Sequence, residues 1–397
     1  MTNEQSPRYR RVANPMPLGP TSLVLGFLLL TLAIGHWDLG FRDSSALPTP
    51  TSWPRARMQA PEYGMQASLW WDENVARRDL ALIHDAGFTW VKQHVGWRDI
   101  EGIVKGNYDW YFTDRIVADA EQFGLDILFR LDSQPVWTLP PEDVRSGPIE
   151  NPQDLGDFCN RLADRYRGRV RAYQVWNEPN LAREWQDCPP DPAGYVALLR
   201  ACYVGIKSAD PDALVISAGL APTGSGPPDV MPDVDYLIGM YEAGAAPYFD
   251  LLGVNAPGYK APPELSPDDA ANPELGYGGQ RFFCFRHVED MREIMTRYGD
   301  GDKQVAVLEM GWSTDPRQDS PYHWHAVTQE QQAEYLTRAF RYAGENWSSW
   351  IGLMTVISIA DPRWTEEDEQ YWWAITEPGW PETRVRPAYD ALREMEK

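Results

Sequence analysis

Two hydrophobic patterns alternate along this chain from Gly64 to the C-terminus. Short apolar runs, typical of buried strands, alternate with longer segments whose apolar residues recur at helical spacing. The strand-like runs are residues 65–70, 90–95, 126–131, 170–176, 213–218, 250–255, 304–309 and 351–358. The helical segments are residues 74–85, 112–123, 192–209, 286–298, 330–345 and 386–395.

Eight strand-like runs with helical segments between them predict an α/β fold of the (β/α)8 type, the TIM barrel. A doubly wound open sheet is the alternative for such an alternating chain. That fold usually carries a glycine-rich turn after its first strand, whereas the bulky sequence Leu69-Trp70-Trp71-Asp72 stands there in this chain. The barrel is therefore the predicted architecture, with its active site where the carboxyl ends of the strands meet.

The N-terminal part of the chain has a different pattern. Residues 1–17 are polar and contain three arginines, and no charged residue follows until Asp38. The uncharged span is long enough to cross a bilayer, which takes about 20 residues, and its basic flank predicts a cytoplasmic N-terminus. We expect a cytoplasmic tail (1–17), a transmembrane anchor (18–37), a Pro- and Ser-rich linker (38–62) and a barrel domain (63–397) outside the cytoplasm. A cleaved signal peptide, which would make the protein secreted, is the alternative.

The charge balance excludes one class of partner. The chain has 58 acidic and 36 basic residues, a formal net charge of -22. Contacts to phosphates need clustered Lys and Arg, so we do not expect nucleic acid as a partner. Aromatic residues make up 12% of the chain and include 18 Trp. Flat indole faces with a polar edge suit sugar-binding clefts as well as cores.

The four cysteines do not form a recognisable motif. Cys159 and Cys202 fall in helical patterns, so we expect them to be buried thiols. Cys188 and Cys284 fall in loop-like segments, and a disulfide between these two is an open alternative. The chain contains no CxxC pair, so no metal site is expected.

Two carboxylates stand at the ends of apolar strands. The run 170–176 leads into Asn177-Glu178-Pro179, and the run 304–309 ends on Glu309. Burying a carboxylate costs free energy unless it is paired or used. In a barrel, the ends of the fourth and seventh strands face the same mouth. Two carboxylates in one mouth are what hydrolysis of a glycosidic bond requires.

These two strand ends resemble the corresponding sites of the clan A glycoside hydrolases, which carry Asn-Glu-Pro after the fourth strand and Glu after the seventh. Further stretches are similar to the branch of that clan with family 39 β-xylosidases and bacterial exopolysaccharide hydrolases. They are Trp97-Arg98-Asp99-Ile100-Glu101, Gly106-Asn107-Tyr108-Asp109-Trp110, Asp361-Pro362 and Arg386-Pro387-Ala388-Tyr389. The resemblance covers roughly residues 64–395.

The resemblance implies roles for individual residues. Glu178 would be the general acid/base, with a raised pKa, and Glu309 the ionised nucleophile, about 5–5.5 Å away. Asn177 would bind the sugar 2-hydroxyl. The other residues expected to bind substrate are Trp176, His94, Lys92, Asn255, Tyr259 and Trp312. Trp137, Trp312, Trp364, Trp372, Trp373 and Trp380 follow strand ends and are candidates for sugar-stacking platforms or barrel caps.

Two positions depart from the clan's usual pattern. Lys92 stands where the second strand often carries Arg, and Asn255 stands where the sixth often carries His. Lys92 or Tyr259 is the expected donor to Glu309. We expect a retaining glycoside hydrolase that cleaves O-glycosidic bonds of a β-linked oligo- or polysaccharide and needs no cofactor. The alternative is a catalytically weak barrel that acts as a glycan-binding or scaffold subunit of a membrane-associated assembly.

Overall fold

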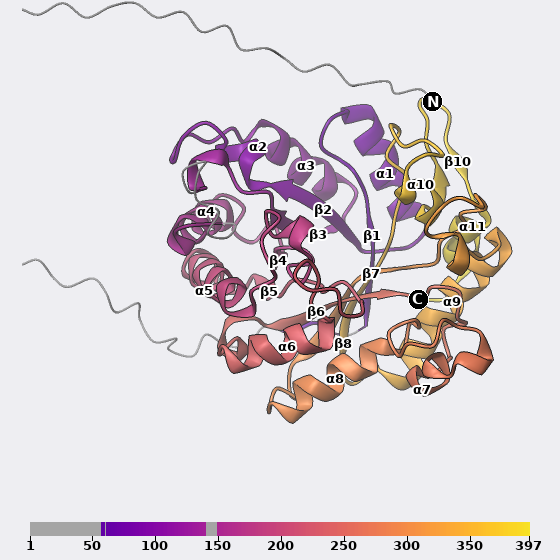
Figure 1. The fold of residues 1–397 in the computed structure, drawn as a ribbon. Coiled ribbons are helices and arrows are strands. Elements are labelled where there is room, and N and C mark those ends of the chain that lie inside the picture. The colour runs from indigo at the N-terminus through magenta and orange to yellow at the C-terminus, as the bar shows by residue number, and fades with distance from the viewer. Residues whose placement is uncertain (1–56, 60, 140–148) are drawn as a thin grey trace, which may run out of the picture. The chain divides into compact units, whose positions relative to one another are not determined.

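The computed structural model describes residues 57–59, 61–139 and 149–397. Within them, eight parallel strands form a closed barrel in the order β1 to β8, with helices around it (Figure 1). The strands are β1 (Glu62–Gln66), β2 (Trp90–Gly96), β3 (Asp126–Asp132), β4 (Ala172–Val175), β5 (Leu214–Ile216), β6 (Leu251–Pro257), β7 (Gln304–Gly311) and β8 (Ile351–Val356). The predicted (β/α)8 barrel is therefore confirmed.

The described residues contain all of the predicted helical segments and further helices that were not predicted. The helices are α1 (Glu73–Asp85), α2 (Trp97–Glu101), α3 (Tyr111–Gln122), α4 (Pro152–Arg165), α5 (Pro192–Ala209), α6 (Asp233–Glu242), α7 (Pro267–Ala271), α8 (His287–Arg297), α9 (Gln329–Asn346), α10 (Glu369–Trp373) and α11 (Pro387–Glu394). A small hairpin, β9 (Thr376–Glu377) with β10 (Arg384–Val385), follows α10. The last helix, α11, reaches back to α1, where the Tyr389 hydroxyl donates to the carbonyl oxygen of Leu82 at 2.9 Å.

The first strand lies earlier than its apolar run indicated. The run at residues 65–70 was expected to be the strand, but β1 ends at Gln66. Leu69 and Trp70 are buried in the core between strands and helices. An apolar run marks burial, and burial occurs on both sides of a barrel wall. The start of β1, Glu62, falls within the stretch that we expected to be linker.

The barrel interior has an apolar lower layer and a polar upper layer. The lower layer consists of Met58, Trp90, Leu128, Ala172, Leu214, Ile216, Leu251, Ala306, Leu308 and Leu353. Side chains alternate along a strand, so the residue two positions further also faces inward. At that level β2, β3 and β4 carry Lys92, Arg130 and Gln174, and on β6 Asn255 lies four residues beyond Leu251. The apolar layer therefore supports a polar floor beneath the carboxyl ends of the strands.

Met58 closes the lower end of the barrel. Its backbone N–H donates to the Gln304 side chain at 2.9 Å, and its carbonyl accepts from the same amide at 3.2 Å. The Met58 side chain is buried against the lower layer. Met58 falls in the expected linker 38–62, so the end of that segment belongs to the barrel. The sequence did not predict this burial, because a single apolar residue such as Met58 forms no periodic pattern.

The cysteines pair differently from the expectation. Cys159 of α4 and Cys202 of α5 form a disulfide with a Cα–Cα distance of 5.3 Å. Cys188 and Cys284 are free. The expectation of buried thiols at the first pair was therefore wrong, and the disulfide left open for the second pair is not formed. The helical spacing correctly indicated burial, but it does not say which residue of another helix lies opposite.

Two glycines explain why the disulfide-linked helices lie so close. A Cβ atom on Gly205 of α5 would lie 2.3 Å from the carbonyl oxygen of Gly156 on α4. Real Cβ atoms do not approach a backbone oxygen that closely, so both helices need glycine at this crossing. The crossing places the cysteines of the two helices in register.

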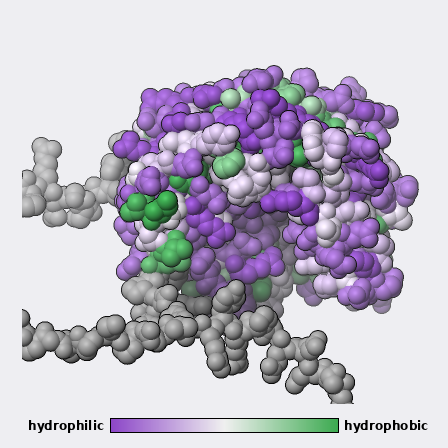
Figure 2. All heavy atoms as spheres, turned by 90° about the horizontal axis from the view of Figure 1, so that it is seen from above, coloured by the Kyte–Doolittle hydropathy of each residue, from purple (hydrophilic) through white to green (hydrophobic). Residues whose placement is uncertain are grey.

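The tail 1–17, the segment 18–37 and the expected linker up to residue 56 lie outside the described residues. Among the residues that are described, no helix combines the length and the apolar character needed to cross a bilayer. One face of the molecule is mostly hydrophilic, with apolar residues in small groups (Figure 2). This is consistent with the acidic composition of the chain.

Candidate active site

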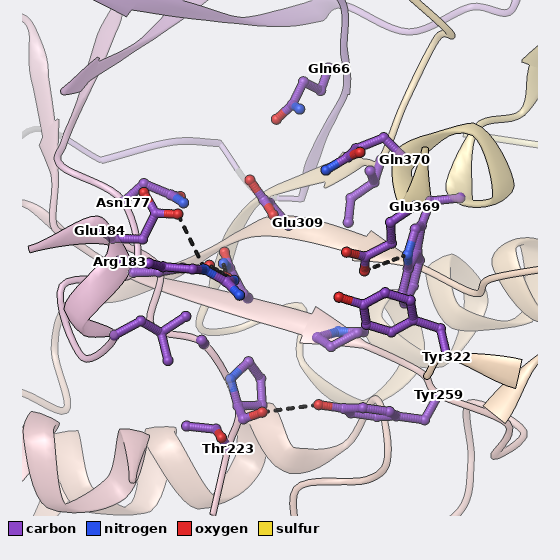
Figure 3. Close-up of a pocket in the computed structure, with 18 of the residues that line it drawn as sticks. Gln66, Asn177, Arg183, Glu184, Thr223, Tyr259, Glu309, Tyr322, Glu369 and Gln370 are labelled. Atoms are coloured by element: carbon purple, nitrogen blue, oxygen red, sulfur yellow. Dashed lines mark hydrogen bonds and ion pairs between the residues drawn. The ribbon is translucent and has the colours of Figure 1, made fainter. Parts of the chain in front are cut away.

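A pocket of about 650 Å³ lies at the carboxyl ends of the barrel strands (Figure 3). It contains both candidate glutamates, Glu178 and Glu309. The other residues that line it are Gln66, Arg130, Asn177, Leu181, Arg183, Glu184, Ala221, Pro222, Thr223, Val230, Asn255, Pro257, Tyr259, Tyr322, His325, Ile357, Trp364, Glu369, Gln370 and Trp373. The carboxyl groups expected to face one barrel mouth from β4 and β7 thus line a single cavity.

Glu178 is presented by a strained turn rather than by the strand itself. β4 ends at Val175, three residues earlier than Glu178. Trp176 and Glu178 have left-handed backbone conformations, with φ of 71° and 42°. Non-glycine residues adopt this conformation rarely and at a cost, and such residues cluster at functional sites. The Glu178 N–H donates to the carbonyl oxygen of Gly219 at 3.0 Å, which holds the turn against the loop after β5.

Glu309 lies inside β7, two residues before its end, and a β-bulge turns it inward. Val307 pairs with Val254 of β6, whereas Glu309 pairs with the very next residue, Asn255. Leu308 is the extra residue of the bulge, and its side chain belongs to the barrel interior. A bulge lets two consecutive side chains face the same side of a sheet. Leu308 therefore fills the interior while Glu309 lines the pocket.

Two cations hold Glu309 on one of its oxygens. Lys92 Nζ lies 3.0 Å and Arg130 Nη1 3.4 Å from Oε1 of Glu309. Burial acts to raise the pKa of Glu309, but the charges of Lys92 and Arg130 outweigh it and keep this pKa below its usual value. Lys92 Nζ also donates to the carbonyl oxygen of Leu308 at 3.0 Å, an acceptor that favours the ammonium form. Glu309 is therefore an ionised carboxylate at neutral pH.

The second candidate donor to Glu309 is placed elsewhere. The Tyr259 hydroxyl donates to the carbonyl oxygen of Pro222 at 3.0 Å and not to Glu309. Tyr259 itself has a left-handed backbone, with φ of 51°. Its ring lines the pocket as an aromatic surface. Lys92 thus donates to Glu309 and the Tyr259 hydroxyl does not, because the turn after β6 directs this side chain toward the β5 loop.

The environment of Glu178 differs from that of Glu309. Burial, followed by the charge of Glu309, raises the pKa of Glu178 to about 7. Asn255 Nδ2 donates to Oε1 of Glu178 at 3.0 Å. Arg183 Nη2 lies 3.4 Å from the other oxygen, Oε2. Glu178 is thus substantially protonated near neutral pH, while its partner carboxyl stays ionised.

The pair can therefore perform acid/base and nucleophilic chemistry at the same pH. A protonated carboxyl can donate to a leaving group, and an ionised carboxylate can attack an electrophilic carbon or stabilise a cation. Lys92 and Arg130 both contact Oε1 of Glu309. Among the described residues no hydrogen-bond donor lies on Oε2 of Glu309, so this oxygen is left for a ligand.

The structure separates the expected sugar-binding tryptophans into two groups. Trp312 is fully buried, and its indole N–H donates to the carbonyl oxygen of Ala261 at 2.9 Å. Trp176 is also buried and donates to the carbonyl oxygen of Glu184 at 2.9 Å. Neither is among the residues that line the pocket, although both were expected to bind substrate. Each indole packs between the strands and the surrounding helices, where burial of a large ring is most favourable.

The aromatic wall of the pocket comes instead from loops after the strands. Trp364 and Trp373, both among the candidate tryptophans, line the cavity together with Tyr259, Tyr322 and His325. Burial lowers the pKa of His325 to about 4, so it is neutral at pH 7. The described residues contain no group of three metal-ligating side chains.

Asn177 and Asn255 line the pocket as expected, whereas His94 does not. His94 Nε2 lies 2.5 Å from Oδ1 of Asp132, at the neighbouring end of β3. Asn255 is the residue that connects the two glutamates. It pairs in register with Glu309 and donates to Glu178. The amide that replaces the usual His is therefore part of the site.

Several pocket residues carried no usable signal in the sequence. Arg183 and Glu184 lie on a short 3-10 turn, and Tyr322 lies on a loop. Glu369 and Gln370 begin α10, a five-residue helix too short to show a periodic pattern. Arg130 is different, because it lies at an inward position of an otherwise apolar strand (DILFRLD). A charge at such a position must be paired, and this rule would have identified Arg130 as a partner of a buried carboxylate.

The comparisons with known proteins support the fold. No protein-family model and no curated protein matches the sequence. Among solved structures, a family 39 glycoside hydrolase from the gut symbiont Bacteroides cellulosilyticus WH2 is similar, with a TM-score of 0.62 and 19% identity over 85% of this chain. The chain spans 63% of the length of that structure.

Other similar structures belong to different glycoside hydrolases. A glucosidase from Croceicoccus marinus has a TM-score of 0.59 and 13% identity, covering 85% of this chain and 67% of its own. Xylanase 10B from Thermotoga maritima has a TM-score of 0.53 and 15% identity, covering 84% of this chain and 93% of its own. The structural neighbours of this chain are thus glycoside hydrolases of family 39 and of related clan A families, with which it shares the (β/α)8 barrel.

Proposed function

We propose that this protein is a retaining glycoside hydrolase that acts on a β-linked glycan. One observation carries the proposal: Glu178 and Glu309 line the same pocket and have pKa values shifted in opposite directions. Titratable pairs whose environments separate their pKa values are typical of an acid and a nucleophile. The similarity to solved glycoside hydrolases supports the reaction class.

In the first step, protonated Glu178 donates its proton to the glycosidic oxygen, and Glu309 attacks the anomeric carbon. The bond from the anomeric carbon to the leaving oxygen breaks as the bond to Glu309 forms. In the second step, the Glu178 carboxylate takes a proton from water, which displaces Glu309 and leaves the anomeric configuration retained. Lys92 and Arg130 keep the nucleophile ionised, and we assign the binding of the sugar 2-hydroxyl to Asn177, which lines the pocket.

The pocket fits a sugar without strong negative charge. Glu184, Glu309 and Glu369 contribute carboxylates, and the whole chain carries a net charge of -22. A polyanionic glycan would be repelled by this field. Trp364 and Trp373 provide aromatic surface against which apolar sugar faces can stack. We therefore propose a neutral or amine-bearing β-glycan as the substrate class.

The glycan-binding alternative gains some support from the Lys92–Glu309 ion pair, because a paired carboxylate can be purely structural. Both cations contact Oε1, however, and Glu309 lines the pocket. The pair therefore leaves one oxygen for attack, and we favour the hydrolase.

A trapping experiment separates the two functions. The full-length protein is incubated with activated 2-deoxy-2-fluoro β-glycosides of several sugars, and intact-mass spectrometry follows the chain. We expect one added glycosyl group on a peptide that contains Glu309, and none in Glu309→Gln. Retention is checked by proton NMR of the first-formed anomer. Sugar binding without any adduct or turnover across the panel would support the glycan-binding alternative instead.

We also propose that residues 18–37 anchor the protein in a membrane with the barrel outside the cytoplasm. The disulfide between Cys159 and Cys202 supports this, since disulfides persist mainly in oxidising compartments. Protease added outside intact cells should remove the barrel while leaving a membrane-bound N-terminal fragment. A soluble mature chain that begins near residue 36 would indicate a cleaved signal peptide.

A further inference from the structure

Arg183 is a cation at the pocket that solvent and ligands can reach. It lies on the 3-10 turn Ala182–Glu184, five residues after Glu178. Its side chain is 68% exposed, whereas those of Lys92 and Arg130 are 1% and 19% exposed. Its guanidinium lies 3.4 Å from Oε2 of Glu178 and 3.5 Å from Oε1 of Glu184. Figure 3 shows Arg183 beside Glu184.

The two oxygens of Glu178 have different partners. Oε1 accepts a hydrogen bond from Asn255 Nδ2 at 3.0 Å. The Oδ1 atom of Asn255 lies against Gly219, where an added Cβ would lie 2.1 Å away, so the amide nitrogen is the atom that faces Glu178. A donor N–H cannot share Oε1 comfortably with an acid proton. When Glu178 is neutral, its proton therefore belongs on Oε2, the oxygen that Arg183 faces.

A guanidinium has five N–H donors and no acceptor. It can bind Oε2 of the carboxylate, but it cannot accept a hydrogen bond from Oε2–H. We propose that Arg183 is a positioning residue that competes with the acid proton for Oε2 of Glu178. Arg183 pairs with Glu178 in the carboxylate state and swings toward Glu184 when Glu178 is protonated.

The role in the reaction rests on the proposed function. Before proton donation, Oε2 must face the glycosidic oxygen, so Arg183 lies toward Glu184. Once Oε2 has lost its proton to the leaving group, Arg183 returns and stabilises the new carboxylate. It leaves again when Oε2 accepts the proton of the attacking water. The exposed side chain and its two long ion pairs suit this exchange, because each contact is weak.

Other groups also face Glu178 and form the electrostatic environment in which its pKa is set. They are Glu309 of β7, Glu184 beside Arg183, Asn255 of β6, Lys92 of β2, Arg130 of β3, Tyr259 after β6 and Tyr322 on the loop after β7. Burial and the charges of Glu309 and Glu184 raise the pKa of Glu178, while Arg183 and Asn255 lower it. Removing Arg183 therefore shifts the balance toward the neutral acid.

The test compares Arg183→Gln, which removes the charge, with Arg183→Lys, which keeps it. The Glu178 carboxyl is titrated directly by 13C NMR of protein labelled at the glutamate side-chain carboxyl, and Glu178→Gln assigns the signal. We expect Arg183→Gln to raise the titration midpoint by about 0.2–0.7 pH unit, the size of one exposed ion pair. Arg183→Lys should stay close to the wild type. The basic limb of the kcat/KM profile should move with the NMR midpoint.

Salt provides a second measurement on the unmodified chain. An exposed ion pair is screened at about 1 M salt, so the wild-type midpoint should rise at high salt and that of Arg183→Gln should change much less. An unchanged or lowered midpoint in Arg183→Gln, or equal salt responses in both proteins, would overturn the proposal. The NMR titration needs no turnover. A shifted midpoint without any hydrolysis would reject the proposed function alone, and hydrolysis with an unshifted midpoint would reject this inference alone.

Discussion

The ammonium group of Lys92 lies 3.0 Å from Oε1 of Glu309 and connects β2 to β7 through the barrel interior. The Lys92 side chain is 1% exposed, so the ion pair is shielded from water. Removing one partner of a buried pair leaves the other charge uncompensated, which typically costs about 3–5 kcal/mol. Arg130 remains near the same oxygen and should offset part of this cost.

We therefore expect Lys92→Met to lower the free energy of unfolding at pH 7 by about 3 kcal/mol. It should also raise the pKa of Glu309, which would move the acidic limb of the activity profile upward. Lys92→Arg, which restores the charge, is the control and should recover most of the stability. Urea unfolding and a pH profile measure both effects. A Lys92→Met protein as stable as the wild type would mean that Arg130 alone compensates Glu309.

The two glutamates should respond differently to replacement. Glu178→Ala should slow substrates with poor leaving groups most, because they need protonation, while activated aryl glycosides should lose much less in the first step. Added azide should partly restore turnover. Glu309→Ala should abolish retaining turnover of every substrate, because no covalent intermediate can form. Equal losses for good and poor leaving groups in Glu178→Ala would contradict the acid/base role.

The raised pKa of Glu178 should appear in stability as well as in activity. The group binds its proton more tightly in the folded state, with a pKa of about 7 against an ordinary value of 4.5. Its contribution is therefore complete below about pH 4.5 and is lost as pH rises through 7, by up to about 3 kcal/mol. Glu178→Gln should remove this part of the pH dependence. Unfolding free energies at pH 5 and pH 8 for both proteins measure it, and identical slopes would refute the shift.

The disulfide between α4 and α5 should contribute strongly to stability. It closes a loop with a sequence separation of 43 residues, for which chain entropy predicts about 4 kcal/mol. We expect the double variant Cys159→Ala/Cys202→Ala to lose about 3–4 kcal/mol, as measured by urea unfolding. Cys188→Ser, which alters a free cysteine, is the matched control and should behave like the wild type.

Replacing two tryptophans should distinguish a role in core packing from a role in substrate binding. Trp312→Ala should destabilise the fold by about 3–5 kcal/mol, since the ring is fully buried. Trp364→Ala should raise KM with little change in unfolding free energy, because its ring lines the pocket at an intermediate exposure. A normal KM in Trp364→Ala would show that this ring does not contact the sugar.

Periodicity alone was enough for the barrel and for most of its strands. β2, β3, β7 and β8 begin at the residues expected from the sequence, and α5 has the expected bounds. The placement of Glu178 and Glu309 in one mouth followed from their positions after the fourth strand and in the seventh. These features depend on which side chains are buried along a single segment, which local sequence encodes.

The remaining features depend on contacts between segments that are far apart in the sequence. The bulge at Leu308 is defined only by the register between β6 and β7. The disulfide requires α4 and α5 to cross at two glycines.

The direction of a side chain at a strand end was also decided by the tertiary structure. Trp312, directly after β7, packs into the core, while Trp364 on the loop after β8 and Arg183 on the turn after β4 line the pocket. The sequence by itself thus determined the barrel and its two carboxylates. Only the tertiary structure decided the further partners, which are Arg130 on Glu309 and Arg183 and Asn255 on Glu178. Their effect could not be read from the sequence, because pKa values depend on burial and on charges brought together from distant strands.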